Sequence, residues 1–280
     1  MIPAEALLAE GEARLHAAGV ADPAATAGWW LAEVLGVSRG ELHAAGATPV
    51  QCARIREGFE RLANHEPLQY VIGHTPFLDF SVRTDARALV PRPETEELIT
   101  RVLADRVFWS RPGLAVADVG TGTGCMALAL ARSCPDAVVQ AIDCSEATLA
   151  LARENAEALG LATRIQFVRG DLLHGFAPAS LDAVVSNPPY IARAVIETLD
   201  ATVRRYEPRL ALDGGEDGLA VIRRLLEQTF TVLKNRGRVW LEIGEDQGPA
   251  VQALMESTGY QQVCVHRDFY NQIRFAGGVK

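Results

Sequence analysis

The chain after Pro112 alternates between short apolar runs and helical segments, and this alternation restricts the possible folds more than any other feature of the sequence. Repeated units of strand, helix and strand form a parallel, doubly wound sheet, because each connecting helix packs back on a face of the sheet. The expected strands are "LAVADVG", "AVVQAID", "RIQFVRGD", "LDAVVSN", "GRVWLEIG", "YQQVCVH" and "QIRFAGG". The last two have no helix between them, so we expect them to pair antiparallel. The sequence therefore predicts an α/β fold.

The region before Pro112 does not show this alternation of strands and helices. Residues 1–66 are predicted to form a small helical domain, in which Asp22 is expected to cap a helix that starts at Pro23. No catalytic constellation is found there, so the domain is interpreted as a structural bundle or a partner-binding face. Residues 67–90 contain two β-rich runs, "YVIG" and "FLDFSV", which predict a β-hairpin linker. Residues 91–280 are expected to form the α/β domain.

Composition and charge narrow the class of protein. Hydrophobic residues make up 49% of the 280 residues and charged residues 22%, so the chain can bury a sizeable core. The formal net charge of -8 argues against a surface built to bind nucleic-acid phosphates. The cysteines form no CxxC pair, the N-terminus lacks a basic signal region, and no apolar run approaches the roughly 18 residues of a membrane span. We therefore expect a cytoplasmic protein without a metal site.

A glycine-rich turn follows the first strand of the α/β region and predicts a cofactor site. In "VADVGTGTGCMAL", Gly120, Gly122 and Gly124 let the backbone approach a ligand closely, and the helix after them offers free N–H groups. Asp143 ends the next strand, where a carboxylate can accept hydrogen bonds from both hydroxyls of a ribose. NAD would require a third glycine at the position of Cys125, so the spacing favours S-adenosylmethionine.

Further side chains complete the expected cofactor site. Asp118 precedes the glycines and is expected either to orient the turn or to lie near the cationic methionine portion of the cofactor. "GDLL" follows the third strand, so Asp171 and Leu172 are expected to flank the adenine ring. The candidate cofactor-binding residues are Asp118, Gly120, Thr121, Gly122, Thr123, Gly124, Asp143, Asp171, Leu172 and Asn187.

The run "SNPPY" at residues 186–190 ends a buried strand abruptly. Proline fixes φ and cannot donate to a sheet ladder, so the two prolines stop the strand and hold its carbonyl groups in fixed directions. The Asn187 side-chain oxygen and the Pro188 carbonyl can both accept hydrogen bonds from one planar NH₂ group, and Tyr190 offers a face for stacking. This arrangement predicts methylation of an exocyclic amine or an amide nitrogen. Asn187, Pro188, Pro189 and Tyr190 are the candidate catalytic and substrate-binding residues.

The motifs "DVGTGTG", "AID", "GDLL" and "SNPPYI", in this order, resemble those of class I S-adenosylmethionine-dependent methyltransferases that modify a planar nitrogen. "EPLQYVIGHTPF", "LVPRPETEEL", "YEPRLALDGGEDGL" and "LEIGEDQG" narrow the resemblance to the HemK-type peptide chain release factor glutamine methyltransferases. The resemblance implies a mostly parallel, seven-stranded, Rossmann-like sheet and a helical domain for substrate recognition, joined by a β-hairpin. It also implies methyl transfer to the side-chain N5 of the GGQ-motif glutamine in release factors, which would be the protein partners.

Other functions remain open on the sequence alone. A nucleic-acid adenine or guanine N-methyltransferase would share the cofactor residues and NPPY, although the acidic charge and the lack of an Arg/Lys-rich stripe argue against it. A binding module that senses S-adenosylmethionine would not need a clamp for a nucleophile. An NAD-dependent oxidoreductase is disfavoured by Cys125. Leu172 stands where the family often has an aromatic beside the adenine, so a stacking role is not carried over to it.

Overall fold

The computed structural model describes residues 1–280, which divide into two compact units. Unit 1 consists of Met1–His74 and Asp200–Tyr206, and unit 2 consists of Thr75–Leu199 and Glu207–Lys280. No pattern in the sequence indicated that residues 200–206 group with the N-terminal helices. The division into residues 1–66, 67–90 and 91–280, which rests on motif positions, stays a prediction. No helix is both long and apolar enough to cross a membrane.

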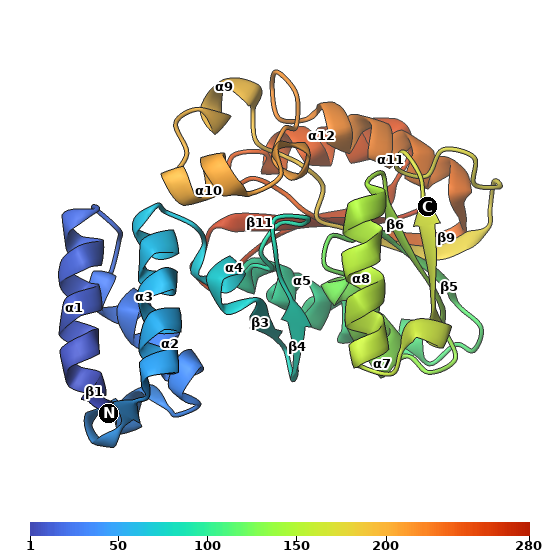
Figure 1. Cartoon of the computed structure of the whole chain (residues 1–280). Helices are drawn as coiled ribbons and strands as arrows, with labels where there is room; N and C mark the ends of the chain where they lie inside the picture. Colours follow the sequence, from blue (N-terminus) through green and yellow to red (C-terminus); the bar gives the residue numbers. More distant parts are fainter. The chain divides into compact units, whose positions relative to one another are not determined.

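Unit 1 is a helical bundle around an apolar core (Figure 1). Two glycines let its helices approach closely: a Cβ at Gly58 would lie 2.1 Å from the Trp30 indole, and one at Gly11 would lie 2.3 Å from the Phe59 ring. The indole N–H of Trp30 donates to the carbonyl of Ile55 at 2.9 Å. The elements are β1 (Ile2–Pro3), α1 (Ala4–Ala17), α2 (Pro23–Leu35), η1 (Arg39–Ala44), β2 (Gly46–Ala47), α3 (Pro49–Ala63), α4 (Leu68–Ile72) and α10 (Ala201–Tyr206).

Two local expectations in this region are wrong. Asp22 does precede α2, but it has a left-handed φ of 45° and its side chain makes no capping hydrogen bond. The run "YVIG" forms no strand, because it lies within and just after the short helix α4, which buries Tyr70 and Val71. Val71 belongs to the core of the bundle, and this packing outweighs the β propensity of the run. The hairpin is formed instead by β3 (His74–Phe77) and β4 (Phe80–Arg83).

Unit 2 contains a seven-stranded sheet of order β10-β11-β9-β8-β5-β6-β7. The strands β9, β8, β5, β6 and β7 run parallel, and β11 pairs antiparallel with both β9 and β10, which confirms the predicted pairing of the last two runs. The chain fills β5, β6 and β7 in sequence and then returns to the other side of β5. The strands are β5 (Ala115–Val119), β6 (Val138–Asp143), β7 (Ile165–Arg169), β8 (Leu181–Ser186), β9 (Leu233–Glu242), β10 (Gln261–Arg267) and β11 (Ile273–Val279).

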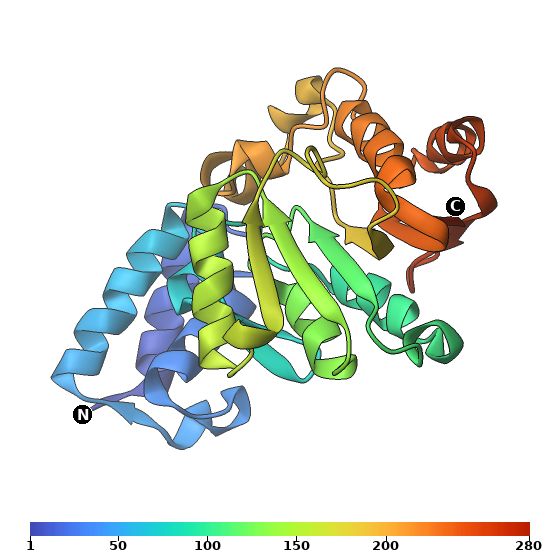
Figure 2. The same cartoon turned by 90° about the vertical axis from the view of Figure 1, so that its right-hand side faces the viewer.

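Helices cover both faces of this sheet, and Figure 2 shows the central strands side by side between them. One core includes side chains of α5, α7 and α8, and the other includes side chains of α11 and α12. The doubly wound α/β fold predicted from the sequence is thereby confirmed. The helical elements are α5 (Pro93–Leu103), α6 (Arg106–Trp109), α7 (Cys125–Ser133), α8 (Glu146–Ala158), η2 (Ala162–Arg164), α9 (Arg193–Ile196), η3 (Arg209–Ala211), α11 (Ala220–Val232) and α12 (Gly248–Thr258).

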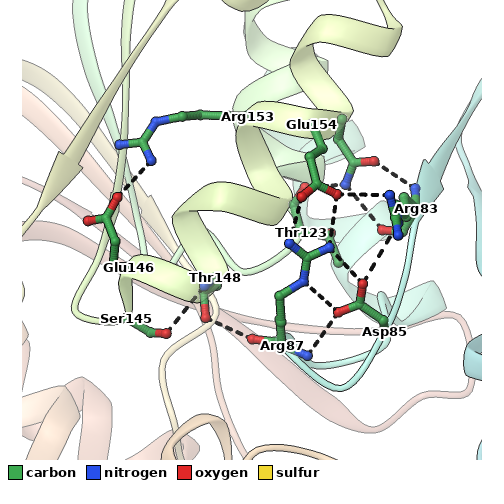
Figure 3. A network of polar contacts seen from close by, with 10 residues as sticks. Arg83, Asp85, Arg87, Thr123, Ser145, Glu146, Thr148, Arg153 and Glu154 are labelled. Atoms are coloured by element: carbon green, nitrogen blue, oxygen red, sulfur yellow. Dashed lines mark hydrogen bonds and ion pairs between the residues drawn. The ribbon is translucent and has the colours of Figure 1, made fainter.

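The segment after the hairpin is fixed to α8 by a polar network (Figure 3). The Arg87 guanidinium donates to the carboxylates of Asp85 and Glu154, with the shortest distance in each pair at 2.7 Å. The Thr148 hydroxyl donates to the Arg87 carbonyl at 2.7 Å. Asn155 is buried, and its side chain accepts from the backbone amide of Arg83 in β4 and donates to the backbone carbonyl of the same residue. These bonds hold residues 84–90 as a wall beside the carboxyl end of the sheet.

Candidate active site

A cavity of about 480 Å³ opens at the carboxyl ends of β5 and β8, where the strand order reverses. Ligands bind at such switch points in open α/β sheets, because the loops after the two strands diverge there. Among the residues predicted from the sequence, those that line the cavity are Gly120, Thr121, Gly122, Thr123, Asp143, Asp171, Leu172, Asn187 and Pro189. Asp118, Gly124, Pro188 and Tyr190 do not line it. The structure thus brings the glycine turn, the ends of β6 and β7, and "SNPPY" to one place.

The glycine turn needs glycine for its backbone and for its packing. Gly120, Gly122 and Gly124 have φ values of 72°, 56° and 85°, in the left-handed region that side chains disfavour. A Cβ at Gly124 would also lie 3.1 Å from the Cβ of Ala152 on α8. The amides of Gly120 and Thr121 both donate to the carbonyl of Ile142, at 2.8 and 3.0 Å. The turn is therefore fixed against β6, with its backbone on the cavity.

Asp118 supports this turn from behind. One carboxylate oxygen, Oδ2, accepts hydrogen bonds from the Thr121 hydroxyl at 2.7 Å and from the Ala127 amide at 3.0 Å. These bonds correspond to the first of the two predicted roles, that of orienting the turn. Burial raises the pKa of this carboxyl to about 7, although the two hydrogen bonds act in the opposite direction. Its other oxygen, Oδ1, and the Thr123 hydroxyl are buried without a hydrogen-bond partner, so both groups in this turn remain able to form further hydrogen bonds.

Asp143 lies at the end of β6 and on the cavity. Its Oδ1 accepts from the Ser145 amide at 3.0 Å, and its Oδ2 accepts from the Gly122 amide at 3.3 Å. Burial raises its pKa, and these backbone hydrogen bonds oppose the rise. Each carboxylate oxygen can accept more than one hydrogen bond, so the group can still bind ligand hydroxyls. Ser145 in turn caps α8 by accepting from the Thr148 amide.

Asp171 and Leu172 follow β7 at the rim of the cavity. The Asp171 carboxylate is exposed and forms an ion pair with Arg224 of α11, which also lines the cavity. Leu172 has a φ of 54°, which is uncommon for a branched apolar residue, and its partly buried side chain packs against the core formed with α11 and α12. Whether these residues flank an adenine ring stays a prediction.

"SNPPY" is held in place by segments distant in the sequence. The Ser186 hydroxyl donates to the Val119 carbonyl of β5 at 2.6 Å, which joins the ends of the two strands. The Gln247 side-chain amide donates to the Tyr190 carbonyl at 2.9 Å and to the Gly218 carbonyl at 3.1 Å. A Cβ at Gly218 would lie 2.5 Å from the backbone carbonyl oxygen of Tyr190, so only glycine allows this approach.

The Asn187 side chain is connected to a buried carboxylate. Its Nδ2 donates to the Thr95 hydroxyl of α5 at 3.1 Å, and that hydroxyl donates to Oε2 of Glu242 at 2.7 Å. The other oxygen of Glu242, at the end of β9, accepts from the Tyr190 hydroxyl at 3.4 Å. Burial raises the pKa of Glu242 to about 7, and burial also raises the pKa of Tyr190, with the Glu242 charge adding to it.

Sequence reasoning quoted the motifs that contain these supporting residues without finding their roles. Thr95 belongs to "PRPETEEL", Glu242 and Gln247 to "LEIGEDQG", and Gly218 to "DGGEDGL". Two of these motifs also meet in an ion pair, in which Arg92 of "LVPRPETEEL" contacts the buried carboxylate of Glu207 in "YEPRLALDGGEDGL" at 2.7 Å. The only signal in the sequence was that these polar residues and Gly218 lie inside the quoted motifs.

Comparison with known proteins decides the family. A "PrmC N-terminal domain" family model matches residues 6–73, and a "Methyltransferase small domain" model matches residues 97–216. A release factor glutamine methyltransferase from Caulobacter vibrioides is 40% identical over 95% of this chain and 93% of its own length. The chain belongs to the release factor glutamine methyltransferase family. A second relative of that name, from Moorella thermoacetica, is 41% identical over 90% of this chain and 89% of its own.

A solved structure supports the fold independently of sequence. A methyltransferase from Pyrococcus furiosus superimposes with a TM-score of 0.53, covering 83% of this chain and 99% of that one at 20% identity. At this identity the likeness concerns the fold alone, and it agrees with the seven-stranded sheet described above. The family resemblance inferred from the motifs is confirmed by the relatives.

Proposed function

We propose that this enzyme transfers a methyl group from S-adenosylmethionine to the side-chain N5 of the GGQ-motif glutamine in peptide chain release factors. The observation that carries the proposal is the Asn187 side chain at the cavity, whose Nδ2 is engaged by Thr95 while its Oδ1 accepts no hydrogen bond within the chain. A free amide oxygen fixed in this way suits a substrate NH₂ group. The release factor glutamine methyltransferases among the relatives supply the identity of the substrate.

The residues of the cavity fit S-adenosylmethionine. The glycine turn, fixed by Asp118, lets the backbone approach the ligand, Asp143 is available to the ribose hydroxyls, and the Asp143 carboxylate on the cavity suits a cationic cofactor. When bound, this cofactor supplies an electrophilic methyl group on a sulfonium. No group of three or more His, Cys, Asp or Glu side chains in the structure could hold a metal ion.

Within the proposed reaction, the chain positions an unreactive nitrogen. The lone pair of an amide nitrogen is delocalised into the carbonyl, so the nitrogen is a poor nucleophile. Asn187 Oδ1 and the Pro188 carbonyl are proposed to accept hydrogen bonds from its two N–H groups, which favours a pyramidal nitrogen with its lone pair directed at the methyl carbon. Tyr190 is proposed to pack against the planar amide. Positioning and electrostatics of this kind can lower the barrier without a strong general base.

One assay with labelled S-adenosylmethionine tests the proposal, with an intact release factor, tRNA, rRNA and DNA offered in parallel. We expect label on the release factor alone, at the GGQ glutamine, and we expect no stable binding of nucleic acid by this acidic chain. A release factor whose GGQ glutamine is changed to alanine is the matched control and should take no label. Label on tRNA, rRNA or DNA, with none on the release factor, would contradict the proposal. Because release factors act on cytoplasmic ribosomes, we also expect the enzyme in the cytoplasm.

A short GGQ peptide should be a much poorer substrate than the intact factor. Binding energy from parts of a substrate remote from the reacting atom helps to position that atom. The helices of unit 1 are proposed to supply such a surface, since they contain none of the cavity residues. Equal kcat/KM for peptide and intact factor would remove substrate recognition from unit 1.

A further inference from the structure

We propose that Thr95 and Glu242 are positioning residues that determine which end of the Asn187 side-chain amide faces the substrate. This inference rests on the proposed function, because it assigns a role to the orientation of Asn187. Neither residue was a candidate on the sequence, and both act through Asn187 rather than on the reacting atoms.

The direction of the hydrogen bonds follows from donor and acceptor chemistry. A threonine hydroxyl has one proton to donate, and an ionised carboxylate only accepts. The proton of Thr95 therefore goes to Glu242 Oε2, at 2.7 Å, and the Thr95 oxygen must accept from Asn187. Only Nδ2 of Asn187 can donate, so Nδ2 faces Thr95 at 3.1 Å. The amide oxygen is then left for the substrate.

Without this chain of bonds the amide has no reason to prefer that orientation. Its oxygen and nitrogen ends are similar in size and shape, so rotation by about 180° exchanges an acceptor for a donor at almost no steric cost. An Nδ2 group turned toward the substrate NH₂ would place two sets of donors against each other. The nitrogen would lose the acceptor that holds its proton, and methyl transfer would slow.

Ionisation of Glu242 is part of the same device. If Glu242 is protonated, its O–H can donate to Thr95, which then can donate to Asn187 and draw the amide oxygen inward. Burial and the nearby carboxylate of Glu94 oppose ionisation, whereas Arg274 and the bonds from Thr95 and Tyr190 favour it. The Cys125 thiol on α7 also faces this charge, and burial raises the pKa of that thiol to about 12, so it stays neutral at working pH.

The two side chains that define the clamp are coupled through this one carboxylate. Glu242 Oε1 accepts from the Tyr190 hydroxyl, while its Oε2 accepts from Thr95. Glu242 is 1% exposed and Thr95 is 4% exposed, so water does not compete for these bonds. One buried anion thus orients the side chains at both ends of the NPPY motif.

The test compares Thr95→Val, Thr95→Ser and Glu242→Gln with the wild-type chain in single-turnover methylation of an intact release factor. Thr95→Val keeps the shape of the side chain and removes the hydroxyl. We expect its rate to fall about tenfold to a hundredfold, with the KM for the release factor and the Kd of S-adenosylmethionine within about threefold of wild type. Thr95→Ser retains the hydroxyl and should recover most of the rate. A Thr95→Val enzyme at the wild-type rate, or a Thr95→Ser enzyme as slow as Thr95→Val, would overturn the proposal.

The pH profile separates positioning from a structural role. Between pH 6 and pH 9, the wild-type rate at saturating S-adenosylmethionine should rise as Glu242 ionises. Glu242→Gln should be slow and should lack this part of the rise, so that only the contribution of Asp118, whose pKa is also about 7, remains. A Glu242→Gln profile that matches the wild-type shape would refute the role of Glu242. The wild-type measurement distinguishes failure of this positioning proposal from failure of the proposed function. If the wild-type chain labels no release factor, the proposed function itself is wrong.

Discussion

Gly218→Ala is the change that most directly tests how "SNPPY" is held. Gly218 has a φ of +74°, and a Cβ there would lie 2.5 Å from the Tyr190 carbonyl oxygen and 2.8 Å from Nε2 of Gln247. The left-handed φ alone costs about 1–2 kcal/mol for a residue with a Cβ. The clash adds to this, because overpacking a well-packed site costs roughly 1–3 kcal/mol. We therefore expect a loss of about 2–5 kcal/mol in the free energy of unfolding.

The matched control is Gly160→Ala. Gly160 follows α8 with a φ of +69°, and a Cβ there would meet no atom within 4 Å. This control incurs the cost of the left-handed φ without the clash, so it should lose only about 1–2 kcal/mol. Urea denaturation of both variants and of wild type measures the difference.

Activity should separate the two variants further. Relief of the clash has to move the Tyr190 carbonyl or Gln247, and either shift displaces "SNPPY". A displacement of about 1 Å at a reacting group can cost a hundredfold in rate. Gly218→Ala should therefore lose methylation activity by about this factor under conditions where it remains folded, whereas Gly160→Ala should keep the wild-type rate. If the two variants are equally stable and equally active, the close contact between Gly218 and Tyr190 does not exist.

Other predictions concern single interactions at the site. Asp143→Ala should weaken S-adenosylmethionine binding about tenfold to a hundredfold, since bonds to a charged group contribute roughly 1.5–3 kcal/mol; unchanged affinity by calorimetry would remove Asp143 from the site. Asn187→Ala should lower the single-turnover rate on the order of a hundredfold with a much smaller effect on cofactor affinity, and a wild-type rate would reduce "SNPPY" to a stiff end of a strand. Asn155→Ala should cost about 2–5 kcal/mol in urea denaturation, because its side chain satisfies the amide and carbonyl of Arg83 and the carbonyl of Thr123; a loss below 1 kcal/mol would count against these bonds. Glu242→Gln should raise stability relative to wild type more at pH 8 than at pH 5, and an equal difference at both pH values would argue against a buried, ionisable Glu242. The sign follows from a folded-state pKa of about 7 against 4.5 when unfolded, so the wild-type contribution is present below pH 4.5 and is lost as pH rises through 7.

The sequence predicted the parts of the site that lie at the ends of parallel strands. In a parallel sheet the carboxyl ends of neighbouring strands meet at one edge, so the residues at or just after the ends of "VADV", "QAID" and "DAVVS" had to come together. Gly120, Asp143 and Asn187 accordingly line one cavity. The motif order was enough for this result because the connectivity of βαβ units leaves few alternatives.

The supporting residues could not be predicted in this way. Thr95 and Glu242 are separated by 147 positions, and no spacing rule relates the first turn of a helix to the end of a strand. Acidic residues near the start of a helix favour its dipole, and this local reason alone would account for the glutamates at the start of α5. Glu97 is in fact nearly buried, and its carboxylate binds Arg101 and the backbone amide of Phe269. Such roles depend on tertiary packing, which a local pattern does not encode.

Two buried carboxylates, Asp182 in β8 and Glu242 in β9, have opposite effects on the stability of the fold. Asp182, at the start of β8, accepts from Arg111, Lys234 and the Ala115 amide, and although burial acts to raise its pKa, these partners lower the pKa overall. Its ionised form therefore stabilises the fold above its unfolded pKa, and this contribution is lost as pH falls through the lowered value. Glu242 lies at the carboxyl end of the neighbouring strand β9. Its pKa is raised rather than lowered, so it destabilises the fold when it is ionised.

A chain that needed only a stable sheet would gain nothing from Glu242. Replacing a buried, poorly compensated charge by an apolar side chain of similar volume is often neutral or stabilising. The partners of Glu242 are two neutral hydroxyls rather than cations within hydrogen-bond distance, so its bonds do not fully offset the cost of burying the charge. Those hydroxyls belong to Thr95, which orients Asn187, and to Tyr190. The position of this carboxylate is therefore explained by the orientation of the substrate clamp, and the stability it costs is the reason why activity and stability should respond in opposite directions to Glu242→Gln.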